Sequence, residues 1–264
     1  MKNSLLLFFF FLQVTLSIAQ ISPPGIDGSK LVSWGAIAFN QKLSKKWSIT
    51  VYVGGARQSN PNNAKLFGKP AIAVLNQESL YSFTAHWQLA FCTSFRVQDI
   101  YSKDEPYELS HPGRRNELRY YLRMYYKHAY KRFSFAYNFR PEIRTFYTSS
   151  WEPWHTPLQL RFRLKGQVTY SLNESKSNQL IVANEILTVT DRLESGASHA
   201  WSPYHFTEDR FSNFFRHTFS KPSVIMDLGV MHQFWKGKTD NRLHYTGYLS
   251  VDFIFQNLFG KLIG

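Results

Sequence analysis

Residues 158–170 read LQLRFRLKGQVTY, and this stretch has two different faces. The even positions carry Leu, Leu, Phe, Leu, Gly, Val and Tyr, whereas the odd positions from 159 to 171 carry Gln, Arg, Arg, Lys, Gln, Thr and Ser. Because side chains alternate across a β-strand, the stretch predicts a strand with one apolar face and one polar, largely cationic face.

The two segments before it repeat the pattern. Positions 118–126 place Leu, Tyr, Leu, Met and Tyr opposite Arg, Tyr, Arg and Tyr, and positions 133–139 place Phe, Phe, Tyr and Phe opposite Ser, Ala and Asn. These strands run roughly 12 to 15 residues, against a usual length of about 5 to 6. Long amphipathic strands in series predict one large sheet.

Composition agrees with a single all-β domain. The chain has 264 residues, is 44% hydrophobic and is 17% aromatic, with Phe and Tyr dominating. Its mean hydropathy of −0.32 is that of a soluble protein, but a barrel strand is apolar only at every second residue, so the average misleads. Cys92 is the only cysteine, so we expect no intrachain disulfide and a packing role for this thiol.

The net charge of +13 comes from residues interleaved within strands. The sequence shows no basic run or tail and no nucleic-acid motif, so we do not expect a nucleic-acid partner. Residues 1–19 predict a secretory signal, with Lys2, an apolar core at 5–12 and a small-x-small site at 17–19. The mature domain is then 20–264. It has no apolar run long enough for a transmembrane helix.

Alternation along the rest of the chain gives eleven candidate strands. The third and fourth are expected within 78–87 and 89–101, an eighth within 178–190, and long loops at 58–70, 102–114, 148–157 and 191–208. Bacterial single-chain barrels have an even number of strands, so we expect ten or twelve, with twelve preferred. The predicted fold is a single antiparallel up-and-down transmembrane β-barrel.

Alternation alone does not say which face points inward. A soluble barrel buries its apolar face, whereas an outer-membrane barrel turns that face to lipid and its polar face to the lumen. Export, strand length and the bulk of the apolar side chains favour the outer membrane of a Gram-negative bacterium, with its lipid as a partner. An exported soluble β-protein is the alternative.

In the membrane interpretation, the charged faces line the lumen. Arginine donors suit small anionic solutes, so one hypothesis is a passive pore with a cationic interior. The alternative is a non-conducting barrel filled by Arg–Glu pairs. Both hypotheses use the same candidate lumen-lining residues: Glu117, Arg119, Arg123, Arg140, Glu142, Arg144, Arg161, Arg163 and Glu185.

A third hypothesis, an outer-membrane lipid hydrolase, requires a nucleophile, a base and an orienting group in one motif. Several histidines are available, but none stands in such a motif. We therefore assign no catalytic, metal-binding or cofactor-binding residues. Nothing in the sequence predicts the oligomeric state.

Several segments carry a recognisable pattern of Arg and Glu at strand spacing: Trp34 with the 43–47 turn, 119–127, 137–144, 161–163 and Asn184 with Glu185. Together they resemble a family of uncharacterised bacterial outer-membrane barrels, domain-of-unknown-function family twenty-four-ninety. The resemblance implies an outer-membrane barrel and transfers no active site. The chain departs from the usual pattern in ending on residues 257–264 after its last aromatic pair.

Overall fold

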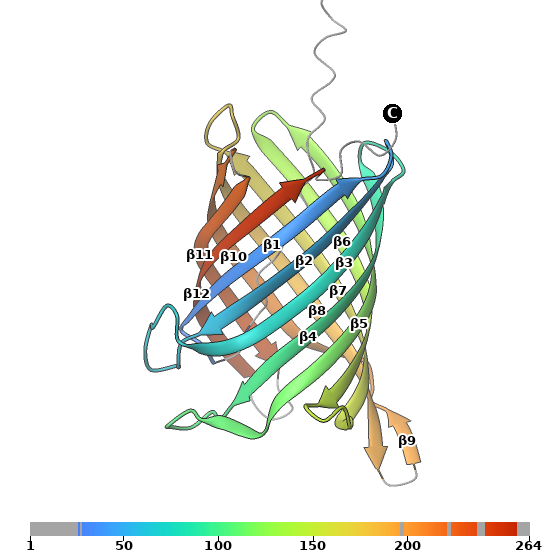
Figure 1. The fold of residues 1–264 in the computed structure, drawn as a ribbon, viewed down its shortest axis with the longest axis vertical. Helices are drawn as coiled ribbons and strands as arrows, with labels where there is room; N and C mark the ends of the chain where they lie inside the picture. Colours follow the sequence, from blue (N-terminus) through green and yellow to red (C-terminus); the bar gives the residue numbers. More distant parts are fainter. Residues whose placement is uncertain (1–25, 27, 196–197, 221–222, 237–240, 258–264) are drawn as a thin grey trace, which may run out of the picture.

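The computed structural model shows an all-β chain arranged as a tilted barrel (Figure 1). The predicted signal at 1–19 lies outside the described residues. Within those residues no helix is long and apolar enough to cross a bilayer. The residues that the structure describes are 26, 28–195, 198–220, 223–236 and 241–257.

The described residues form twelve strands, and the sequence predicted a barrel of ten or twelve with twelve preferred. They are β1 (Leu31–Lys42), β2 (Trp47–Gln58), β3 (Lys69–Ser82), β4 (Trp87–Tyr101), β5 (Leu109–Tyr130), β6 (Phe133–Thr148), β7 (Pro153–Ser171), β8 (Asn178–Ser195), β9 (Ser198–Trp201), β10 (His205–Phe219), β11 (Val224–Lys236) and β12 (Asn241–Gln256).

Of these twelve strands, eleven close the barrel. From β1 to β12, each wall strand pairs antiparallel with the next one, and β8 pairs directly with β10. The last contact, between β12 and β1, is parallel and runs from Leu31 opposite Gly247 to Asn40 opposite Gln256. An odd number of strands makes the first and last run in the same direction, so the closing seam has to be parallel. The total of twelve strands is even, as expected, but it includes β9, which lies outside the wall, and the wall itself has eleven strands.

The twelfth strand, β9, stands outside the wall. The far end of β8 continues past the barrel rim and pairs with β9 from Arg192 to Ser195. This hairpin projects from one end of the barrel (Figure 1). The sequence predicted a loop over 191–208, and that prediction was wrong because the β8–β9 hairpin supplies its own backbone pairing.

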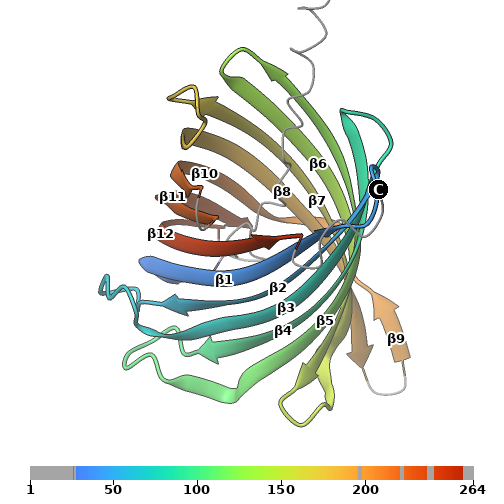
Figure 2. The ribbon, with the colours of Figure 1, turned by 45° about the horizontal axis from the view of Figure 1, so that its top comes forward.

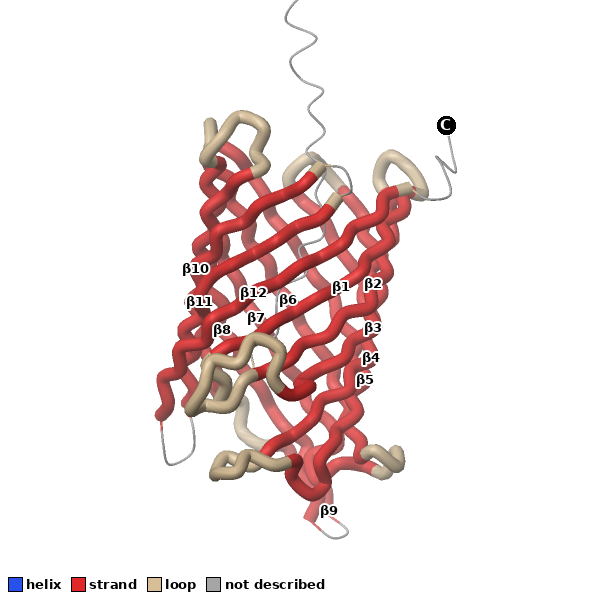
Figure 3. Tube along the Cα trace, turned by 60° about the vertical axis from the view of Figure 1, so that its left-hand side comes forward, coloured by secondary structure: helices blue, strands red, loops and turns tan. Residues whose placement is uncertain are grey.

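The two ends of the barrel differ in their connections (Figure 3). At one end, called the turn end, short connections lie at 43–46, 83–86 and 131–132. The other end, called the loop end, carries the β8–β9 hairpin and the connection 59–68, which is the longest of the described connections.

Three predicted loops are shorter than expected. β3 starts at Lys69 and ends before the turn at 83–86, so the expected third strand within 78–87 was placed too late. β5 starts at Leu109 and runs through Pro112 and Gly113, and β7 starts at Pro153. Proline and glycine were taken as loop signals, but at the start of a strand near the barrel rim they are compatible with the ladder.

The predicted alternation of faces is confirmed. Along β7, Arg161 and Arg163 are 8% and 9% exposed, whereas Leu164 is 56% exposed. The apolar side chains therefore point outward around the wall, and the polar ones point inward. The view in Figure 2, with one end of the barrel tilted forward, shows how the strands curve around this interior.

The interior itself has an apolar side, near the seam. Val32, Trp34, Ala36 and Ala38 of β1 are buried there together with Tyr248 of β12. Across the seam, Trp34 donates its indole N–H to Asp252 Oδ1 at 3.0 Å, and both residues are buried. A methyl group placed on Gly54 of β2 would lie 2.5 Å from a ring carbon of Trp34. Gly54 thus leaves the space that the Trp34 ring occupies.

This contact predicts that Gly54→Ala destabilises the barrel by about 1–3 kcal/mol, because the added methyl overpacks a closely fitted ring. The measurement is the urea unfolding midpoint of the refolded protein in lipid vesicles. Gly35→Ala is the matched control, since its added methyl would meet only Val251 O, at 3.9 Å. Equal midpoints for both variants would contradict the role given to Trp34.

Candidate functional site

The inward faces of β5 to β8 carry the charged side chains predicted for the lumen. Eight of the nine candidate residues are at most 9% exposed, and the side chain of the ninth, Arg123, is 14% exposed. The structure brings all nine to the buried face of the wall. They are Glu117, Arg119 and Arg123 of β5, Arg140, Glu142 and Arg144 of β6, Arg161 and Arg163 of β7, and Glu185 of β8.

Glu142 is the centre of this network. It is 2% exposed and lies against guanidinium groups from three strands. A buried carboxylate loses its hydration, so it stays ionised only where cations and hydrogen bonds replace the water. Its partners are Arg140 at 2.6 Å, Arg161 at 2.5 Å, Arg163 at 3.4 Å and Arg119 at 3.8 Å.

The network continues in both directions from Glu142. Toward β5, Arg119 and Arg144 both contact Glu117, at 2.7 and 2.6 Å. Toward β8, Arg163 joins Glu142 to Glu185, with a distance of 2.5 Å to the latter. These shared partners connect the ion pairs into one chain across four neighbouring strands.

Beyond β8 the chain of pairs reaches β10 and β11. Arg210 of β10 lies 3.3 Å from Glu185 and 2.6 Å from Glu208, and all three are buried. Gln233 of β11 then donates to Glu208 Oε1 at 2.7 Å. The network therefore runs around the wall from β5 to β11.

Strand register explains why carboxylates are needed here. Arg119 is directly opposite Arg144, and Arg140 is directly opposite Arg163. Like charges opposite one another destabilise a sheet. One carboxylate serves each pair: Glu117 contacts Arg119 and Arg144, and Glu142 contacts Arg140 and Arg163.

A smaller cluster adjoins the network on β3 and β4. Glu78 lies 3.2 Å from Arg123 and accepts a hydrogen bond from the Tyr125 hydroxyl at 3.4 Å. The thiol of Cys92 lies 3.5 Å from the same carboxylate and is fully buried. These contacts place the single cysteine in the packed interior.

Sequence reasoning missed several members of the network. Glu208 was assigned to a loop, although the spacing Glu208-x-Arg210 repeats that of Glu117-x-Arg119. This repetition was the signal that could have extended the strand. Glu78 and Arg96 were missed because the boundaries of β3 and β4 were uncertain, so their faces were not assigned.

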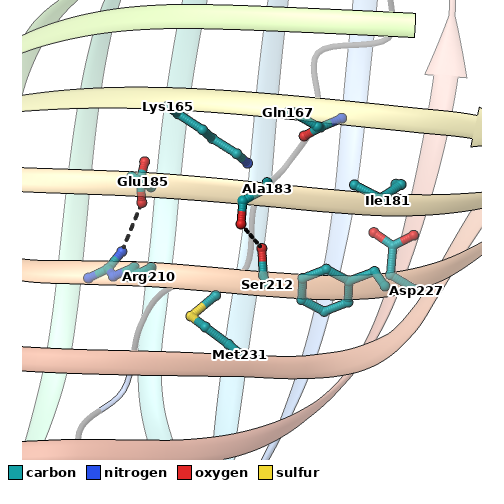
Figure 4. A pocket seen from close by; sticks show the side chains of 10 residues that line it. Lys165, Gln167, Ile181, Ala183, Glu185, Arg210, Ser212, Asp227 and Met231 are labelled. Carbon is teal, nitrogen blue, oxygen red and sulfur yellow. Dashed lines mark hydrogen bonds and ion pairs between the residues drawn. The ribbon is translucent and has the colours of Figure 1, made fainter. Parts of the chain in front are cut away.

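A small cavity lies beside the network, lined by residues of β7, β8, β10 and β11 (Figure 4). Lys165, Glu185 and Arg210 contribute charged groups to its wall, and Ser212 donates to Ala183 O at 3.5 Å. Its volume of about 20 Å³ is enough for a water molecule and too small for a metabolite.

The histidines considered for hydrolysis lie on separate strands and connections. His86 contacts Lys127 O at 2.8 Å, His128 stacks on Phe135, and His217 contacts Asn178. The side chain of His199 is not among those described. Within the described residues, no group of three or more His, Cys, Asp or Glu side chains is arranged to hold a metal ion.

Comparison with known families agrees with the resemblance found in the sequence. The model of DUF2490, a family of proteins of unknown function, matches residues 32–244. The match begins in β1 and ends at the fourth residue of β12, so it covers the wall through β11 and leaves residues 245–256 of β12 outside. The chain therefore belongs to the DUF2490 family. No curated protein matches it.

The centre of the network makes a direct prediction. Glu142→Gln leaves at least four guanidinium groups around a neutral amide, so we expect a loss of about 3–5 kcal/mol in the free energy of unfolding. The measurement is urea unfolding in vesicles. Glu152→Gln, at an exposed position between β6 and β7, is the control with the same change of charge. Similar small losses in both variants would show that the ion pairs contribute little to stability.

Proposed function

We propose that this chain is an outer-membrane β-barrel whose lumen is closed to solutes by its own buried ion pairs. The observation that carries the proposal is the chain of contacts through Glu142, which joins side chains of neighbouring strands across the inward face. The proposal assigns the protein no catalytic activity, so turnover of phospholipid by the folded barrel would contradict it.

The distribution of polarity supports the membrane part of the proposal. Leu122, Leu164 and Ile186 are 45%, 56% and 42% exposed on the outside, while charged side chains are buried inside. A water-soluble barrel has the opposite arrangement. An exposed apolar surface that extends around the wall needs an apolar environment, and lipid provides one.

Aromatic side chains at the two ends support the same conclusion. At the turn end, Tyr81 contacts both Trp47 and Phe83, with ring centroids 4.8 and 4.9 Å apart. At the loop end, Trp151 stacks on Phe95 and contacts Tyr147. Aromatic belts at both interfaces are typical of membrane barrels.

The ion pairs support the closed lumen. Arginine side chains are long, and each one in the network is held by a carboxylate instead of projecting freely into solvent. Moving them aside to admit a solute would separate buried opposite charges, which is strongly unfavourable.

One observation favours the second candidate, an anion-selective pore. Arginines outnumber carboxylates around Glu142, where four guanidinium groups surround one acid. An interior of this kind would attract anions and exclude cations if it opened. The two candidates share the membrane barrel and differ in whether the lumen conducts.

The membrane part is tested by flotation. We expect the refolded mature protein, residues 20–264, to float with phospholipid vesicles and to migrate faster on gels before boiling than after it. The reason is that no other described part of the chain covers the exposed apolar face, so this face is expected to bind lipid. A protein that stays monomeric in plain buffer and leaves the vesicles would overturn the membrane assignment.

The closed lumen is tested by conductance in planar bilayers. We expect no steady current from the folded wild type, and current from the quadruple variant Arg140→Ala, Glu142→Ala, Arg161→Ala, Arg163→Ala. It removes Glu142 together with the three arginines that pair with it on β6 and β7, while Arg119 keeps Glu117 and Glu185 keeps Arg210. Urea titration of the variant confirms that it is folded. Anion-selective steps from the wild type that decrease in Arg163→Glu would establish the pore instead.

A further inference from the structure

Two arginines at the loop end of the lumen differ from those of the central network. Arg96 of β4 and Arg115 of β5 lie near the last inward positions of their strands, where Gln98 is directly opposite Arg115. The side chains of Arg96 and Arg115 are partly exposed. They therefore lie on the loop-end side of the central network, in partial contact with solvent.

Arg115 lacks an acidic partner. Within the part of the chain that the structure describes, no carboxylate lies within 4.0 Å of its guanidinium group. Its Nη2 donates to Gln98 Oε1 at 3.0 Å, and Arg96 Nη2 donates to the same oxygen at 3.3 Å. Two cations thus share one neutral acceptor.

Other donor atoms of these two arginines also lack acceptors. The Nε atoms of Arg96 and Arg115 are buried, and neither has a hydrogen-bond partner among the described residues. Arg96 Nε reaches Glu117 Oε2 only at 4.0 Å, whereas Arg119 and Arg144 contact the other oxygen, Oε1. Glu117 Oε2 is itself buried without a hydrogen-bond partner among the described residues. Buried charged donors without partners are costly, so the group that would satisfy them is an acceptor with negative charge.

Aromatic rings hold Arg115 in place. The guanidinium carbon of Arg115 lies 4.8 Å from the centroid of Phe146 and 5.9 Å from that of Trp154. Arg144 stacks on the same Phe146 ring at 4.7 Å. Because Phe146 and Trp154 are both buried, the donors of Arg115 are preorganised, which reduces the cost of binding.

We propose that Arg96 and Arg115 form an oxyanion-binding site at the loop end of the lumen, with Phe146 and Trp154 as its apolar wall. The planar donors of arginine suit carboxylate, sulfate and phosphate oxygens. The ligand class is a solute or headgroup that carries such an oxyanion. The inference does not depend on whether the lumen conducts.

The test uses the refolded mature protein in a non-ionic maltoside detergent, which carries no oxyanion, with sodium sulfate, inorganic phosphate and sodium acetate as probes. Binding is measured by isothermal titration calorimetry, with sodium chloride at matched ionic strength as the reference. We expect saturable binding of at least one oxyanion to the wild type, weakened about tenfold or more in Arg115→Gln. Arg115→Lys, which keeps the charge without the planar donors, should recover only part of the affinity.

Arg114→Gln is the matched control. Arg114 is the next residue on the same strand, but its side chain is 55% exposed and pairs with Asp99 at 2.8 Å. Binding to this variant should equal that of the wild type. If Arg114→Gln and Arg115→Gln lose affinity equally, or if no oxyanion binds more tightly than chloride, the site does not exist.

A last arm distinguishes free anions from lipid headgroups. Phosphatidic acid mixed into the detergent presents a phosphate on a lipid. A signal with phosphatidic acid that Arg115→Gln abolishes, without binding of inorganic phosphate, assigns the site to a headgroup. Binding of the free anions assigns it to a solute. A phosphatidic acid signal that survives in Arg115→Gln lies elsewhere on the barrel and counts against the proposal.

Discussion

The structure depends on one carboxylate, Glu142, placed among four arginines inside a β-barrel. Each of these groups would be better solvated in water, so their burial is favourable only as a set. The register of the sheet makes the set necessary, since it puts arginines opposite arginines on neighbouring strands. Charge balance and strand pairing are therefore one constraint, because a shifted strand would separate the acid from its cations.

Most apolar side chains on the charged side of the wall point outward. In a soluble domain the hydrophobic effect collapses the chain around its apolar residues. Here many large apolar side chains, such as Leu164 and Leu122, are exposed on the outer wall, while Trp34 and its neighbours fill the apolar side of the interior. The wall gains its cohesion from backbone ladders and ion pairs, and the apolar face supplies affinity for the surroundings. That division of roles is what connects the charged lumen to the proposed membrane location.

The sequence was informative about faces and much less so about ends and closure. Period-two alternation assigned Arg161, Arg163 and Glu142 to a common face because every second residue must share a side. It did not place the start of β5, since Pro112 is excluded from a central ladder but tolerated near the barrel rim. It counted eleven candidate strands, which is the number of strands in the wall, but the expectation of an even number overruled that count and with it the parallel seam. The partners of Glu142 likewise required the register between strands.

The seam between β1 and β12 shows how strand pairing and side-chain packing together close the barrel. Parallel pairing is slightly less stable per residue than antiparallel pairing, and β1 and β12 contribute none of the long charged side chains found on β5 to β8. The structure compensates with packing and with polar contacts across the seam. The Trp34 ring fills the space above Gly54 and donates to Asp252, and Thr246 donates to Ser29 O at 2.9 Å. The barrel thus has an ionic side held by charge and an apolar side held by fit.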